Sequence, residues 1–179
     1  ARLVVLAAAA TGLVLTGATP AHAALACGVN ELDQNVFLVN DGFWNNPVNW
    51  SRSHVPAGGE AVCVPGGIVA RVNSSTTGLL GASGGSTTTL RVEGTVRIES
   101  GTTVGLATAI YGASNLINGG VIQVLGNSTF DMNADQAGAA AFQNAVGGSL
   151  IQVQNGSTVL LRRGFVNAGT IDLTGGGAF

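Results

Sequence analysis

Ionisable side chains that could take part in acid–base chemistry are few in this sequence and stand far apart. Cleavage of a polysaccharide needs clustered carboxylates, as a calcium site or an acid/base pair, together with a basic residue. The second half of the chain offers Glu93, Glu99, Asp131, Asp135 and Asp172 with Arg91, Arg97, Arg162 and Arg163. The stretch DMNAD brings Asp131 and Asp135 close together, but two carboxylates supply fewer oxygens than calcium requires. No catalytic set is predicted, and we interpret these acids as solvated.

Arginine and glutamate alternate at two places in a way that predicts charge pairs. Arg91 and Glu93 stand two residues apart, as do Arg97 and Glu99. Residues two apart lie on the same face of a strand, so each pair is expected to form a surface contact. Arg162 and Arg163 are adjacent, and therefore point to opposite faces.

Metal and nucleophile chemistry has equally little support. There is no CxxC, and His54 is the only histidine after residue 23. His54 also lacks a serine and an acid at the spacing of a triad motif, so we interpret it as a loop residue. The glycine-rich GGSTTT and TGGGAF lack the lysine and helix of a phosphate-binding loop. No catalytic residue, metal or cofactor is predicted.

The composition restricts the class of partner. The chain has 179 residues, 28 of them glycine, with 9% charged residues and a net charge of −2 at pH 7. An ordinary soluble domain carries roughly 25% charged residues, so this surface must be built from Ser, Thr, Asn, Gln and Gly. The few cations form no basic stripe, which argues against nucleic acid as a partner.

Residues 1–23 have the parts of a secretory signal peptide. Arg2 precedes an apolar run from Leu3 to Leu15, and the small-x-small Ala21-His22-Ala23 predicts cleavage after Ala23. The run is shorter than the ~20 residues that span a bilayer, so no membrane span is expected in the mature chain. The absence of Met before Ala1 and the ending TGGGAF predict that the sequence is clipped at both ends.

Export changes the interpretation of Cys27 and Cys63, the only cysteines. In an oxidising compartment an even pair predicts a disulfide, which would stabilise the fold by about 4 kcal/mol in the chain-entropy model. Two isolated buried thiols are the alternative.

A loose repeat occupies the second half of the chain. Four segments share a glycine, a short alternating strand, a polar turn and a further β-branched or aromatic residue: 94–104, 119–130, 148–161 and 168–179. Their aligned apolar positions are Val96/Ile98, Ile122/Val124, Ile151/Val153 and Ile171/Leu173. The separations of about 26, 29 and 20 residues are typical of solenoid coils.

Stacking such strands in parallel would bury a continuous apolar column that no single strand could bury. The expected fold is therefore all-β, a parallel β-helix over residues 68–179, with a β-sandwich as the alternative. Asn118 and Asn167 each precede the glycine that opens a strand, and are expected to stack as a ladder of amides at a corner. Residues 134–146 are expected to form no more than one helical turn or an excursion from a coil.

A solenoid needs a cap over its first coil, and residues 24–67 are predicted to supply it. Trp44 and Trp50 would plug the end of the column together with Phe43, Val55 and Val62, while Pro47 and Pro56 fix an irregular path across it. The expected disulfide would tie this cap segment down.

These residues carry a resemblance. The order of Trp44, Asn49-Trp50-Ser51, Val55-Pro56, Gly58-Gly59-Glu60 and an apolar strand before a Gly/Thr/Val-rich repeat resembles the N-terminal part of large bacterial secreted proteins with parallel β-helix regions, such as adhesins and autotransporter passengers. The alanine-rich leader and the lack of lysine resemble an actinobacterial, high-GC source, which argues against an autotransporter with an outer-membrane barrel.

The resemblance and the repeat together favour an exported, non-enzymatic scaffold for adhesion or surface display, with a cell-surface or extracellular glycan or protein as partner. The first alternative is the N-terminal part of a carbohydrate-active β-helix enzyme, a lyase or hydrolase, whose acids would lie on further coils. A glycan-binding module is the third interpretation, although aromatics beyond Trp44, Trp50 and Tyr111 are scarce.

Overall fold

The computed structural model describes most of the chain after residue 33. The described residues are Cys27, 34–57, 60–74, Leu79, 88–105, 114–132, 142–145, 147–161 and 165–179. The predicted signal peptide lies outside them.

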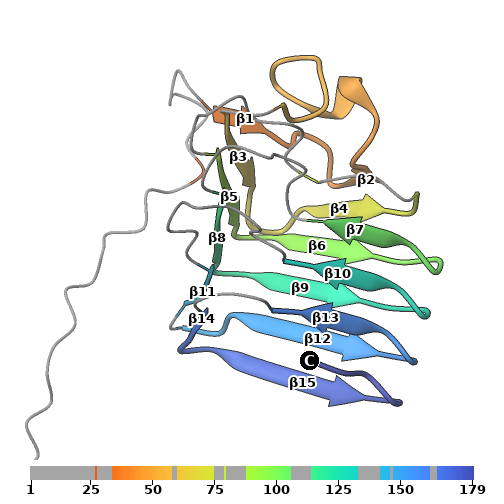
Figure 1. Ribbon diagram of the computed structural model, residues 1–179. Helices are drawn as coiled ribbons and strands as arrows, with labels where there is room; N and C mark the ends of the chain where they lie inside the picture. The colour runs from red at the N-terminus through yellow and green to blue at the C-terminus, as the bar shows by residue number, and fades with distance from the viewer. Residues whose placement is uncertain are drawn as a thin grey trace, which may run out of the picture.

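The fold is a β-solenoid of stacked parallel strands (Figure 1). One six-stranded sheet, here called sheet A, has the order β1 (Gln34–Val36), β3 (Ala61–Val64), β5 (Thr88–Val92), β8 (Ser114–Asn118), β11 (Phe142–Asn144), β14 (Phe165–Asn167). The second six-stranded sheet, sheet C, has the order β15 (Thr170–Thr174), β12 (Leu150–Gln154), β9 (Val121–Val124), β6 (Thr95–Ile98), β4 (Val69–Val72), β2 (Asp41–Phe43). A three-stranded sheet D contains β13 (Thr158–Leu160), β10 (Thr129–Asp131) and β7 (Thr103–Gly105).

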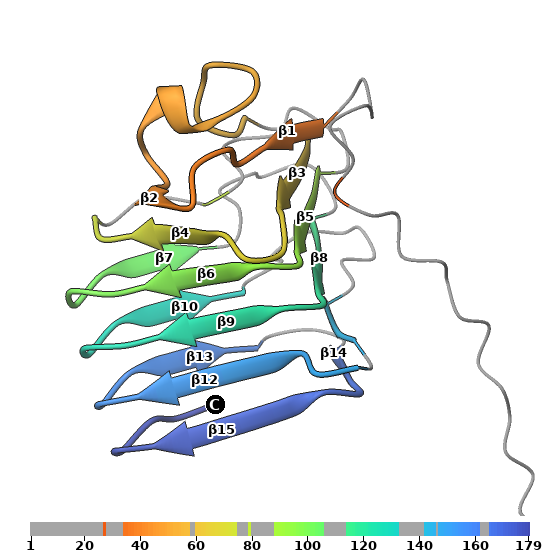
Figure 2. The same cartoon turned by 180° about the vertical axis from the view of Figure 1, so that it is seen from behind.

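Every pairing between these strands is parallel, so the β-sandwich alternative is wrong. Seen from behind, β4, β6, β9, β12 and β15 lie one beneath another, like rungs (Figure 2). Among the described residues the chain runs through sheet A, then sheet C, and in three of the coils also through sheet D. Strands of both large sheets already occur between residues 34 and 67, so the sheets continue across the boundary at residue 67 without a break.

The register of sheet C confirms the repeat alignment residue by residue. Val96 pairs with Ile122, Ile122 with Ile151, and Ile151 with Ile171. Because side chains alternate along a strand, these residues share one face, and the first three are buried in the core. Stacking equivalent apolar residues therefore builds the column that the sequence predicts.

Sheets A and D complete that core. Leu90, Leu116 and Phe142 lie in line on sheet A, and Val104, Phe130 and Val159 lie in line on sheet D. All six side chains are buried in one hydrophobic cluster. Phe142 belongs to the segment 134–146, whose described end forms β11 rather than a helical turn.

A ladder of asparagine amides runs along the corner between sheets A and C, with Asn118 and Asn144 buried and Asn167 exposed. The Asn118 Nδ2 donates to Asn144 Oδ1 at 2.8 Å, and the Asn144 Nδ2 donates to Asn167 Oδ1 at 2.7 Å. Each donor also bonds a carbonyl of the next strand in sheet C, Leu150 O or Thr170 O. The predicted stacking of Asn118 and Asn167 is confirmed, with Asn144 as the connecting residue.

The opposite corner uses residues that tolerate positive φ. Ser100, Asn127 and Asn155 have φ of 66°, 62° and 54°, within the left-handed region that asparagine accepts better than most residues. Just beyond this turn the Ser128 hydroxyl accepts the Thr102 N–H at 3.2 Å, and the Ser157 hydroxyl accepts the Ser128 N–H at 3.1 Å. Hydrogen bonds thus fix the stacking of coils at these two corners.

Candidate functional site

The two cysteines are joined, as the sequence predicts. Cys63 lies in the middle of β3, and its Cα is 5.8 Å from that of Cys27. Cys63 is aligned with Arg91 on the neighbouring strand, so both project from the outer face of sheet A. Cys27 therefore lies against this outer face.

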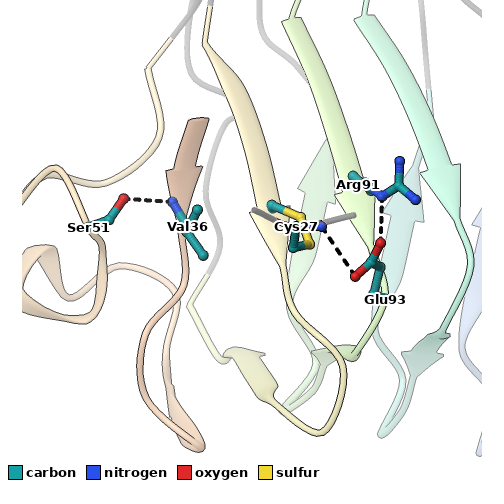
Figure 3. The surroundings of a disulfide bond; sticks show 6 residues. Cys27, Val36, Ser51, Arg91 and Glu93 are labelled. Atoms are coloured by element: carbon teal, nitrogen blue, oxygen red, sulfur yellow. Dashed lines mark hydrogen bonds and ion pairs between the residues drawn. A yellow bond between two sulfur atoms is a disulfide. The ribbon is translucent and has the colours of Figure 1, made fainter. Parts of the chain in front are cut away.

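An ion pair adjoins the disulfide (Figure 3). Arg91 Nε donates to Glu93 Oε1 at 2.8 Å, which confirms the first predicted charge pair. The other oxygen of Glu93 accepts the backbone N–H of Cys27 at 3.4 Å. The Arg91 side chain keeps only 12% of its exposure, although it points away from the core. The segment around Cys27 is thus held by a covalent bond and by a carboxylate.

Two of the predicted cap residues, Trp44 and Trp50, contact each other in a buried aromatic group. The Trp44 and Trp50 rings lie edge to face with centroids 4.7 Å apart, and Phe37 packs in the same way against Trp50 at 4.9 Å. Both indoles are 1% exposed, and their N–H groups donate to backbone carbonyls, Trp50 to Trp44 O and Trp44 to Leu79 O.

The rest of the predicted cap divides between interior and surface. Pro56 is buried and Val55 is half-buried. Phe43 lies at the surface, 41% exposed, with the guanidinium of Arg71 over its ring at 5.2 Å, so the expectation that it plugs the core is wrong. Pro47 begins the short 3-10 helix η1 (Pro47–Asn49), which stands at the N-terminal end of the stack (Figure 1).

The loop that carries His54 is organised around a carboxylate. Glu60 Oε1 lies 3.3 Å from Arg52 Nη1 and 3.2 Å from His54 Nε2. Its other oxygen accepts the Ala57 N–H at 3.0 Å and the Asn35 Nδ2 at 3.4 Å. His54 therefore lies in a loop, as expected, and has a structural partner there.

The predicted acids do not converge. Glu93 directly follows β5 of sheet A, Asp131 lies half-buried on β10 of sheet D, and Asp172 lies on β15 of sheet C. Asp135, Arg162, Arg163 and Tyr111 lie outside the described residues. Within the described ranges no group of three or more His, Cys, Asp or Glu side chains is placed to hold a metal ion. No helix among those residues is long and apolar enough to cross a membrane.

The second predicted charge pair is wrong. Glu99 accepts two hydrogen bonds from Arg71 of the preceding coil, from Nε at 2.8 Å and Nη2 at 2.6 Å. Arg71 also lies 4.0 Å from Asp41. The hydrogen bond and then the charge of Glu99 raise the pKa of Arg71, so its guanidinium stays charged. In a parallel stack, a side chain on the neighbouring coil can lie as close to Glu99 as the side chain two positions before it in the sequence.

Arg97 belongs instead to a row of polar side chains on the outer face of sheet C. The register aligns Arg71, Arg97, Gln123, Gln152 and Asp172 on successive strands. Arg97 Nε donates to Gln123 Oε1 at 2.8 Å, and Gln123 Nε2 donates to Gln152 Oε1 at 2.9 Å. Gln152 Nε2 donates to Asp172 Oδ2 at 3.3 Å. We call these five residues the polar row.

The polar row was not identified from sequence, although a signal was present. In each aligned repeat its member stands between the two apolar positions, in VRI, IQV, IQV and IDL. Alternation places such a residue on the outer face, and the repeat places its equivalents in line.

Comparison with known proteins gives no relative from which a function could be transferred. A scan of protein-family models, a search of curated proteins and a search of solved structures each found no match.

Proposed function

We propose that this chain is an exported, non-enzymatic scaffold that acts in adhesion or interaction at a cell surface or outside the cell. The observation that carries the proposal is the stack itself. Three sheets of parallel strands share one apolar core, and hydrogen-bonded side chains fix two of the corners. Such a stack holds rows of outward side chains at the ~4.8 Å strand spacing, which suits an extended binding surface.

Export is supported by the disulfide and by the leader sequence. The bond between Cys27 and Cys63 is of a kind that persists in oxidising compartments. Residues 1–23 would direct export and be removed after Ala23. The similarity of residues 44–64 to the start of secreted bacterial β-helix proteins supports a bacterial, adhesin-like role. Trp44, Trp50 and Pro56 of the 24–67 segment would seal the first coil.

No observation within the described residues favours the carbohydrate-active alternative, whose acids would lie on further coils. We therefore do not propose it.

The test is expression of the whole chain in an actinobacterium, beside a variant that lacks residues 1–23. We expect the culture medium or cell wall to contain the full chain's product, with Ala24 as its N-terminus and no free thiol. Purified product should bind to washed cells or extracellular matrix in a saturable manner. Retention of the full chain inside the cell, or a product with free thiols, would contradict export. Absence of saturable binding to either surface would contradict adhesion.

A further inference from the structure

The polar row contains an arginine that pairs with no carboxylate of the described residues. Among the described residues Arg52 pairs with Glu60, Arg71 with Glu99 and Arg91 with Glu93. Arg97 lies within 4.0 Å of no described carboxylate, and its hydrogen bond goes to the neutral amide of Gln123. A half-buried guanidinium that bonds through Nε alone keeps the rest of its donors for another molecule.

The amides beside Arg97 are oriented before any ligand arrives. Gln123 and Gln152 each accept a hydrogen bond on the oxygen and donate one from the nitrogen, so neither amide can turn over without loss of both bonds. An amide nitrogen has two hydrogens and an amide oxygen two lone pairs, so each glutamine retains one donor and one acceptor. Side chains already fixed in this way lose little entropy when they bind a ligand.

We infer that the polar row binds a linear acidic polysaccharide along the axis of the solenoid, with a uronate carboxylate on Arg97 and hydroxyl groups on Gln123 and Gln152. A planar guanidinium matches a carboxylate with two parallel hydrogen bonds. Amides that offer both a donor and an acceptor suit sugar hydroxyl groups. The inference names the partner class for the proposed extracellular role and rests on that role for its biological setting.

The position of the row favours a polysaccharide over an acidic peptide. A peptide commonly binds a sheet by adding a strand to its edge, whereas the polar row crosses five neighbouring strands on the sheet's face. Asp172 at the end of the row sets a limit on the ligand, because its negative charge repels a second carboxylate there. The row therefore favours a sugar chain that turns a carboxylate toward Arg97 and hydroxyl groups toward the two glutamines.

Calorimetric titration of the purified chain with polygalacturonate, beside neutral dextran of similar size, tests this inference. We expect saturable binding of polygalacturonate that weakens as salt rises, and no binding of dextran. Arg97→Gln should weaken the affinity at least about tenfold, the usual effect of one hydrogen-bonded charge, since glutamine can still donate to Gln123. Asp172→Asn should tighten binding, because it removes the repulsive charge and keeps an acceptor for Gln152.

Arg52→Gln is the matched control, since it removes the same charge from the loop around Glu60 and should leave the affinity unchanged. Urea denaturation of each variant shows that binding differences do not come from unfolding. Equal binding of dextran, or unchanged affinity in Arg97→Gln, would overturn the inference. If the chain is exported and adheres but does not bind polygalacturonate, this inference fails alone. If it binds through Arg97 but is not exported, the proposed function fails alone.

Discussion

Asn144 connects three coils at a single buried corner. Its oxygen accepts from Asn118, and its nitrogen donates both to Asn167 and to the carbonyl of Thr170. A buried polar group that loses its partner costs more than a hydrogen bond contributes, because water cannot replace the partner. The amide ladder therefore makes the corner specific to asparagine.

Replacing Asn144 by alanine should lower the free energy of unfolding by about 2–3 kcal/mol, since it leaves the Asn118 amide and the Thr170 carbonyl short of a partner. Asn167→Ala is the control, because that residue is exposed and its loss should cost less than about 1 kcal/mol. Urea denaturation followed by circular dichroism measures both. A loss of less than about 1 kcal/mol in Asn144→Ala would show that the ladder contributes little.

Gly120 and Gly119 are adjacent but differ in the space around them. A Cβ on Gly120 would overlap the carbonyl oxygens of Gly94 and Glu93 on the preceding coil, whereas a Cβ on Gly119 would lie 3.6 Å from Val92 O. We expect Gly120→Ala to cost about 3 kcal/mol, because backbone atoms must move, and Gly119→Ala about 1 kcal/mol or less. Thermal unfolding of the pair measures the difference. A Gly119→Ala variant as unstable as Gly120→Ala would contradict the predicted close approach of coils.

The contacts of some single residues can be predicted from the sequence, and those of others cannot. Asn118 and Asn167 were identified because a glycine follows or nearly follows each in a repeated pattern, whereas Asn144 was missed because the sequence QNAVGG shifts the glycines. The partner of Glu99 was missed for another reason. Arg71 is 28 residues away, and only the register of the coils brings it close.

At the scale of elements, the repeated alternating segments that contain Val96, Ile122, Ile151 and Ile171 predict β6, β9, β12 and β15 of sheet C and even their alignment. The repeat does not include β2 and β4 of the same sheet. The short strands of sheet D are harder to predict, since three residues such as Thr103–Gly105 show almost no periodicity. Their hydrogen bonds come from neighbouring coils, which the local sequence does not encode.

The link between Cys27 and sheet A gives an element-scale prediction. The double variant Cys27→Ala, Cys63→Ala should lower the free energy of unfolding by about 4 kcal/mol, because the open chain gains conformational entropy when it unfolds. Denaturation of the wild type with and without reductant measures the same loss independently. A reduced wild type as stable as the oxidised protein would contradict this role of the disulfide.

The molecule as a whole is a stack in which each coil contacts only its neighbours, so the ends determine how easily it opens. The N-terminal end contains Trp44, Trp50 and Phe37 in one aromatic group. Trp50→Ala should cost about 3–5 kcal/mol and increase amide hydrogen exchange in β1–β4 before β9 and β12. Val48→Ala, at a side chain 74% exposed, is the control and should stay within about 0.5 kcal/mol of the wild type. If Trp50→Ala accelerated amide hydrogen exchange equally in all strands, Trp50 would not act as a local seal of the N-terminal end.

The in-register stack of parallel coils is the claim on which the proposed scaffold and the polar row both depend. Asn73 follows β4 and Thr174 ends β15, and both are exposed, so spin labels at Asn73→Cys and Thr174→Cys can be compared by pulsed electron paramagnetic resonance. Four strand steps separate these positions in sheet C. This separation predicts one narrow distribution of label-to-label distances, centred at ~19 Å before allowance for the length of the labels. A broad distribution, or a separation near the ~10 Å between two packed sheets, would contradict the account.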